Sequence, residues 1–187
     1  MNALLGLAAL LLAPAPPKAP LEAPVSVFAE LDGTWEGEFA GYDTEGKEIY
    51  RISVRQTYRT LDDETQEVLI TDTLADGTVI TGRGENTAKL LPDGGLRLRC
   101  VVVKSNNERV THLGRRGTAP DGEPQLVWYS KGIDRWETFR ETVRGHGSEA
   151  VYSIDGVGRY GDTVIIMAGR YRRPAAPRDE TAPRRTP

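Results

Sequence analysis

The sequence predicts an all-β domain, an antiparallel up-and-down meander of about eight to ten strands that closes into a barrel. Stretches of period-two alternation recur between residues 34 and 173, and turn-forming residues separate them at short intervals. No stretch after Leu31 shows a sustained helical period. Because no crossover helix is available to join parallel strands, neighbouring strands must pair through hairpins. A long meander usually closes, since closure removes its exposed edges.

The clearest alternation lies between residues 50 and 58. Its odd positions include Arg51 and Arg55, which would be very costly to bury without partners. The even positions are therefore predicted to face the barrel interior. They are Tyr50, Ile52, Val54, Gln56 and Tyr58. Weaker alternation recurs over residues 68–70, 96–102, 126–128, 150–154 and 164–168, on the positions of even number.

Turn chemistry divides these stretches. Gly, Asn and Asp tolerate the positive φ angles that tight hairpins need. They occur in the segments 43–46, 76–77, 92–95, 106–107, 120–122, 145–147 and 161–162, which are predicted to be the turns.

The ends of the chain differ from its middle. Residues 4–13 contain only Leu, Gly and Ala, a run that suits the core of a signal peptide and is short for a membrane span. We therefore expect a signal-peptide-like segment over residues 1–13 and export to the periplasm or medium, with no stable membrane span after processing. A retained N-terminal helix is the alternative. A Pro/Ala-rich linker is predicted over residues 14–24, the barrel domain over 25–173, and a disordered tail over 174–187.

Composition excludes several classes of protein. The 24 basic and 27 acidic residues nearly balance, which argues against a nucleic-acid partner. Cys100 is the single cysteine, so no intrachain disulfide forms, and with His112 and His146 it gives too few ligands for structural zinc. Since Cys100 alternates with Leu98 and Val102, it is predicted to be a small buried hydrophobe. No cofactor or metal is expected.

A short apolar turn precedes the first predicted strand. Ser26 is placed to cap it, with Val27, Phe28 and Leu31 as its apolar residues. The triplet Gly33-Thr34-Trp35 then opens the strand. An apolar turn followed by Gly-x-Trp resembles the opening of lipocalins and related calycin barrels.

The resemblance implies a structural plug. In that family the Trp packs at the closed end of the barrel and an Arg of the last strand lies across it. Trp35 would be this Trp, and either Arg170 or Arg172 would stack on it as a cation–π pair. The family's usual disulfide and a clear C-terminal helix are absent from the sequence, so the resemblance is to a broader lipocalin-like relative.

No sequence motif for catalysis stands out. If His112 faces inward it is the candidate axial ligand for a haem, although a satisfied core histidine is favoured. Glu137 and Glu141 alternate with Arg135, Arg140 and Arg144, which predicts cross-strand pairing on a solvated face.

The inward aromatic and amide residues suggest a ligand site. Tyr50, Gln56, Tyr58, Trp128 and Tyr152 are predicted to line an apolar pocket with a few polar groups, open at the end away from Trp35. The function expected is that of an exported, non-catalytic protein holding a small apolar or amphipathic ligand. The alternatives are a filled barrel that acts as a structural or interaction module and, less favoured, a haem-binding or enzymatic barrel.

Overall fold

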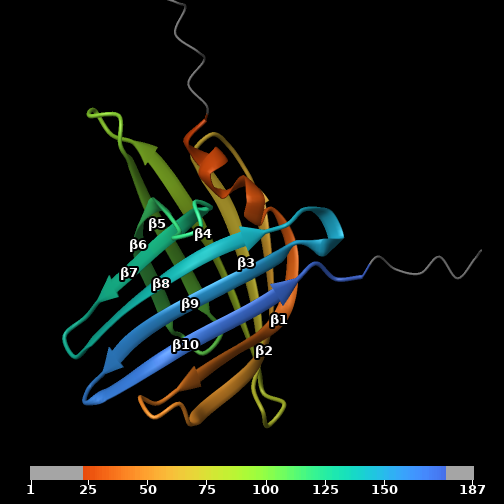
Figure 1. Ribbon diagram of the computed structural model, residues 1–187, viewed down its shortest axis with the longest axis vertical. Coiled ribbons are helices and arrows are strands. Elements are labelled where there is room, and N and C mark those ends of the chain that lie inside the picture. The colour runs from red at the N-terminus through yellow and green to blue at the C-terminus, as the bar shows by residue number, and fades with distance from the viewer. Residues whose placement is uncertain (1–22, 176–187) are drawn as a thin grey trace, which may run out of the picture.

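A computed structural model describes residues 23–175, which form one closed barrel of ten antiparallel strands (Figure 1). Every strand pairs with the next in sequence, and β1 pairs with β10 to close the barrel. The predicted fold class is confirmed. The strands are β1 Gly33–Tyr42, β2 Glu48–Thr60, β3 Thr65–Thr73, β4 Val79–Leu90, β5 Leu96–Lys104, β6 Arg109–Thr118, β7 Pro124–Lys131, β8 Arg135–Arg144, β9 Val151–Tyr160 and β10 Thr163–Arg172. The signal-peptide-like segment and nearly all of the predicted linker and tail lie outside the described residues.

A 3-10 helix, η1 (Pro24–Leu31), lies across one end of the barrel and is drawn in orange-red in Figure 1. Val25, Phe28 and Leu31 are buried, and their spacing of three is the period of a 3-10 helix. The helix begins before Ser26 and no side chain caps it, so the predicted Ser26 cap is wrong. Pro24 instead occupies the first turn, where a missing N–H costs nothing. A second short 3-10 helix is η2 (Gly147–Glu149). No helix within residues 23–175 is long and apolar enough to cross a membrane.

Four hairpin loops contain the same type of local hydrogen bond. In each, an Asp or Asn side chain accepts the backbone N–H two residues further on, and the residue between them has positive φ. This hydrogen bond defines an Asx turn, and it explains why residue chemistry predicted these four hairpin loops correctly. The accepting residues are Asp76, Asp93, Asn106 and Asp121, and the residues of positive φ are Gly77, Gly94, Asn107 and Gly122.

The inward-facing positions predicted for β2 are confirmed, whereas those predicted for β10 are wrong. In β10 the inward residues are at odd positions, with Met167 and Tyr171 buried, while Ile166 is 46% exposed. Residues 164–166 are all apolar, so alternation did not distinguish the two faces. The odd positions of β10 face inward because Tyr171 is one of them, and its ring packs against that of Tyr152 with centroids 5.2 Å apart.

Trp35 closes the helix end of the barrel, as the resemblance implied. Its side chain is fully buried, and its indole Nε1 donates to the carbonyl oxygen of Leu31 over 2.7 Å. The guanidinium carbon of Arg173 lies 3.8 Å from the centroid of the indole. Arg173 also donates to the backbone carbonyls of Asp32 and Glu30. The plug therefore ties together η1, the start of β1 and the end of β10.

The assignment of the stacking residue to Arg170 or Arg172 was wrong. Both are exposed, and Arg170 pairs with Asp155 of the neighbouring strand over 2.7 Å on the outer surface. Arg173 follows directly after β10, where the chain leaves the sheet and the strand alternation no longer applies. The residue that stacks on Trp35 is therefore the one directly after the strand.

A buried amide anchors η1 to the barrel. Gln66 of β3 is fully buried, and its Nε2 donates to the Phe28 carbonyl over 3.1 Å and to Asp32 over 2.9 Å. Its Oε1 accepts a bond of 3.0 Å from Asn86. Asp32 in turn accepts from both the backbone and the hydroxyl of Thr60. These bonds satisfy the polar groups that the helix buries.

Candidate ligand-binding cavity

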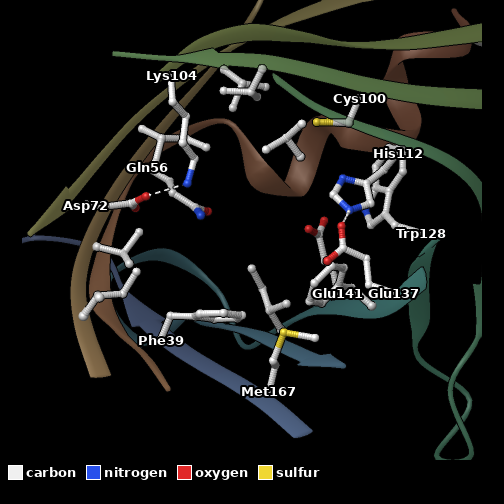
Figure 2. Close-up of a pocket in the computed structure, with 18 of the residues that line it drawn as sticks. Phe39, Gln56, Asp72, Cys100, Lys104, His112, Trp128, Glu137, Glu141 and Met167 are labelled. Carbon is white, nitrogen blue, oxygen red and sulfur yellow. Dashed lines mark hydrogen bonds and ion pairs between the residues drawn. The ribbon is translucent and has the colours of Figure 1, made fainter. Parts of the chain in front are cut away.

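The barrel encloses a cavity of about 340 Å³ (Figure 2). This volume lies within the range of about 300–1,000 Å³ that is typical of small-molecule sites. The cavity runs from Tyr58 and Trp128, near the helix end, to Glu108 and Arg135, at the opposite hairpins. It therefore reaches the end of the barrel away from Trp35. Its apolar lining comprises Phe39, Ile52, Val54, Val68, Ile70, Val102, Val110, Phe139, Ile154 and Met167.

The deep end of the cavity holds a hydrogen-bonded polar group. The Tyr58 hydroxyl donates to Gln56 Oε1 over 2.7 Å and lies 3.3 Å from the Tyr152 hydroxyl. Burial raises the pKa of Tyr58 and of Tyr152 well above the usual value, so both phenols stay protonated. Of the five residues proposed from sequence, Tyr50, Gln56, Tyr58 and Trp128 line the cavity. Tyr152 is not part of the lining, and its ring packs edge-on against that of Tyr58 with centroids 6.2 Å apart.

The position of Trp128 depends on a glycine in the adjacent strand. Gly114 of β6 is paired with Trp128 of β7, and a Cβ at Gly114 would lie 2.4 Å from the indole carbon Cε3. The missing side chain lets the indole lie flat across β6 at the deep end of the cavity. Phe28 of η1 stacks on the same indole, with centroids 6.2 Å apart and planes 11° apart.

Glu137 faces the cavity, which corrects its predicted place on a solvated surface. It is 5% exposed and lies 2.9 Å from His112 Nε2 and 3.1 Å from the Arg135 guanidinium. The Tyr160 hydroxyl also donates to it. Although burial alone would raise the pKa of Glu137, the bonds from His112 and Tyr160 and the charge of Arg135 lower it to about 2. Glu137 is thus an ionised group with several partners.

Glu141 also faces the cavity, against the same prediction. It lies deeper than Glu137 on β8, and Figure 2 shows its carboxylate directed into the open space. Burial raises its pKa, and hydrogen bonding with Trp128 and Tyr152 together with the charge of His112 offsets only part of that effect. Among residues 23–175 it makes no ion pair. Apart from Arg135, which lies on β8 itself, the partners of both glutamates come from other strands, so the sequence of β8 alone did not reveal them.

A second ion pair lies across the cavity from His112 and Glu137 (Figure 2). Lys104 Nζ is 2.8 Å from Asp72 and 3.8 Å from Glu108. Asp72 is buried on the face of β3 that also carries Val68 and Ile70. Asp72 was not among the residues predicted from sequence, although it continues the even-numbered positions of Val68 and Ile70 and so shares their inward face.

Two residues of possible chemical interest have ordinary roles. Cys100 lines the cavity, and burial raises its pKa to about 12, so its thiol stays protonated and unreactive. His112 is engaged by Glu137 and packs edge-on against Phe139, with centroids 5.4 Å apart. Within the described part of the chain, no group of three or more His, Cys, Asp or Glu residues is placed to hold a metal ion.

These features define a class of protein, namely closed antiparallel meander barrels with one plugged end and an internal cavity. The S-type phycobiliprotein lyase CPES from Guillardia theta has a similar structure. The two chains are 10% identical, and the match covers 81% of this chain and 93% of that one with a TM-score of 0.57. At 10% identity this likeness supports the barrel fold alone.

Two designed proteins also match over most of their length. A designed fluorescence-activating β-barrel is 14% identical over 82% of this chain and 98% of its own, with a TM-score of 0.39. A redesigned β-barrel, mFAP1, bound to DFHBI is 15% identical over 82% of this chain and 100% of its own, with a TM-score of 0.39. Both scores are too low to support an argument. No family model and no curated protein sequence matches this chain, so membership of the lipocalin family itself stays a prediction.

Proposed function

We propose that this protein is an exported, non-catalytic binding protein that holds a small apolar or amphipathic ligand inside its barrel. The observation on which the proposal depends is the cavity of about 340 Å³ between the Trp35 plug and the opposite hairpins. A filled barrel acting only as an interaction module would lack this space. The cavity therefore favours the binding function.

The lining fits such a ligand. Most of the wall is aliphatic or aromatic, which favours burial of an apolar body. A few polar groups converge at the deep end, where Gln56 and Tyr58 offer hydrogen bonds that can fix the orientation of a polar head.

A haem-binding role gains no support from His112. To act as an axial ligand, its Nε2 would have to leave Glu137, and the buried carboxylate would lose one of its partners. Removing a partner from a buried charge is costly.

Ligand binding is tested by native mass spectrometry of protein purified from its own host. The expected result is an added mass, released on denaturation, from a molecule small enough for the cavity. A titration with the neutral fluorescent alcohol 1-naphthalenemethanol provides a second measurement, and saturable binding is expected. Absence of both a retained ligand and saturable binding would refute the binding function.

Export is tested separately. We expect the mature chain isolated from the host to begin between Pro14 and Pro24, which N-terminal sequencing of the exported fraction would show. An intact Met1 on protein found in the cytoplasm would contradict export without affecting the binding proposal.

A further inference from the structure

The charges that line the cavity do not balance. Four carboxylates face it, whereas the permanently charged basic residues on its lining are only Lys104 and Arg135. Lys104 pairs with Asp72 and Glu108, and Arg135 pairs with Glu137. The fourth carboxylate, Glu141, makes no ion pair among the described residues, although the charge of His112 acts on it from a distance.

Glu141 is surrounded by groups that suit a cation. Its neighbours include Trp128 and Tyr152, which hydrogen-bond it, and Tyr58 and Tyr171, whose phenols are close enough to interact with its charge. Tyr58, Trp128 and Tyr171 line the cavity themselves. Aromatic rings around a carboxylate are the usual means of binding an ammonium group, through charge pairing and cation–π contact.

We propose that the ligand is a small organic cation, an amine with an apolar body, whose ammonium group binds Glu141 at the deep end of the cavity. This inference rests on the proposed binding function and specifies its ligand class. The apolar body would lie along the aliphatic walls, toward Ile52 and Val110. The ammonium would supply the ion-pair partner that Glu141 lacks among residues 23–175.

The opposite charge does not fit the cavity. A carboxylate or phosphate at the deep end would face Glu141 directly, and like charges in a low-dielectric site repel strongly. Lys104 and Arg135 are nearer the open end, and each already has an acidic partner. His112 is likewise bonded to Glu137.

The test uses three probes with the same two-ring body and different heads, namely 1-naphthylmethylamine, 1-naphthalenemethanol and 1-naphthoate. The full chain is titrated with each at neutral pH. The amine is expected to bind at least about ten-fold more tightly than the alcohol, since hydrogen bonds to charged groups are the stronger ones. The carboxylate is expected to bind most weakly.

Two matched variants locate the effect. Glu141→Gln is expected to reduce the preference for the amine over the alcohol by about ten-fold. Glu149→Gln makes the same charge change at an exposed position and is expected to leave that preference unchanged. If the wild-type protein binds the alcohol at least as tightly as the amine, or if Glu149→Gln lowers the preference as much as Glu141→Gln, the cation proposal is wrong while the binding function stands. If no probe binds and the host protein retains no ligand, the binding function fails as well.

Discussion

The two ends of the barrel differ in how deeply their polar groups are buried. At the helix end, Trp35, Arg173 and Gln66 find their polar partners within the chain and leave little space. At the open end, Glu108 and Arg135 make ion pairs while remaining about two-fifths exposed at the margin of the cavity. The difference indicates that stabilising contacts are concentrated at the closed end, whereas the cavity extends to the opposite end.

The same contrast recurs within one strand. Glu137 and Glu141 both point inward from β8, four residues apart. Three neighbouring side chains stabilise the charge of Glu137, whereas Glu141 has hydrogen bonds but makes no ion pair within residues 23–175. Burial therefore opposes ionisation of both, and only at Glu137 is it outweighed.

The largest effect is expected at the closed end. Trp35→Ala removes a fully buried indole and its hydrogen bond to Leu31, and should cost about 3–5 kcal/mol of unfolding free energy. Denaturant unfolding followed by circular dichroism measures it. An unchanged midpoint would mean that Trp35 does not hold the closed end together.

Glu137→Gln should remove an acid-sensitive part of the stability. The pKa of Glu137 is about 2 in the folded protein, below the unfolded value of about 4.3, so its contribution is complete above that unfolded value. The contribution, up to about 3 kcal/mol, is lost as the pH falls through about 2. Wild type and variant should therefore differ most at neutral pH and converge near pH 2 in thermal melts. A constant difference across that range would contradict the pairing of Glu137.

Glu141→Gln should have the opposite effect. Its folded pKa is raised, so its ionisation destabilises the fold as the pH rises above the unfolded value of about 4.3. The neutral amide should therefore raise the melting temperature at neutral pH. This gain should vanish in acid, where both proteins are neutral at this position. A lower melting temperature at pH 7 would show that Glu141 is stabilised by a charge.

The sequence was a good guide where a residue's role depends on its immediate neighbours. Turn chemistry located seven of the nine loops between successive strands, because an Asp or Asn followed by Gly acts within its own loop. The loops at 61–64 and 132–134 were not among the predicted turns. The inward face of β2 was equally predictable from the sequence, since its arginines could not be buried without charged partners.

The sequence was a poor guide where a role depends on partners far along the chain. Glu137 is tolerable inside the barrel because His112 of β6 and Tyr160 of β9 meet it there, 25 and 23 residues away. Gln66 is buried because η1 presents the Phe28 carbonyl 38 residues earlier in the chain. Arg173 was not predicted to stack on Trp35 because it lies one residue after the end of β10, where strand alternation no longer assigns a residue to a face.

Arg173→Ala should distinguish it from the two arginines before it. The substitution removes the cation–π contact with Trp35 and bonds to two backbone carbonyls, for an expected loss of about 1–2 kcal/mol. Arg172→Ala is the control, since its side chain is exposed and should change stability by less than about 0.5 kcal/mol. Equal losses in the two variants would remove Arg173 from the plug.

The smallest effect is expected from one hydroxyl at the deep end of the cavity. Tyr58→Phe keeps the ring and removes the donor that binds Gln56 Oε1 over 2.7 Å. The head of 1-naphthalenemethanol would then meet a rearranged polar group, and its affinity should fall by about two- to ten-fold, the value of one neutral hydrogen bond. Gln56→Leu should act in the same direction, because it removes the acceptor of the same bond. 1-Methylnaphthalene has the same rings without the head, so its affinity should hardly change in either variant. Tyr129→Phe makes the identical chemical change at an exposed position of β7 and should leave both probes unaffected. If Tyr58→Phe and Gln56→Leu bind the alcohol as the wild type does, ligand heads do not reach this end of the cavity, and the ligand must instead be held near the open end.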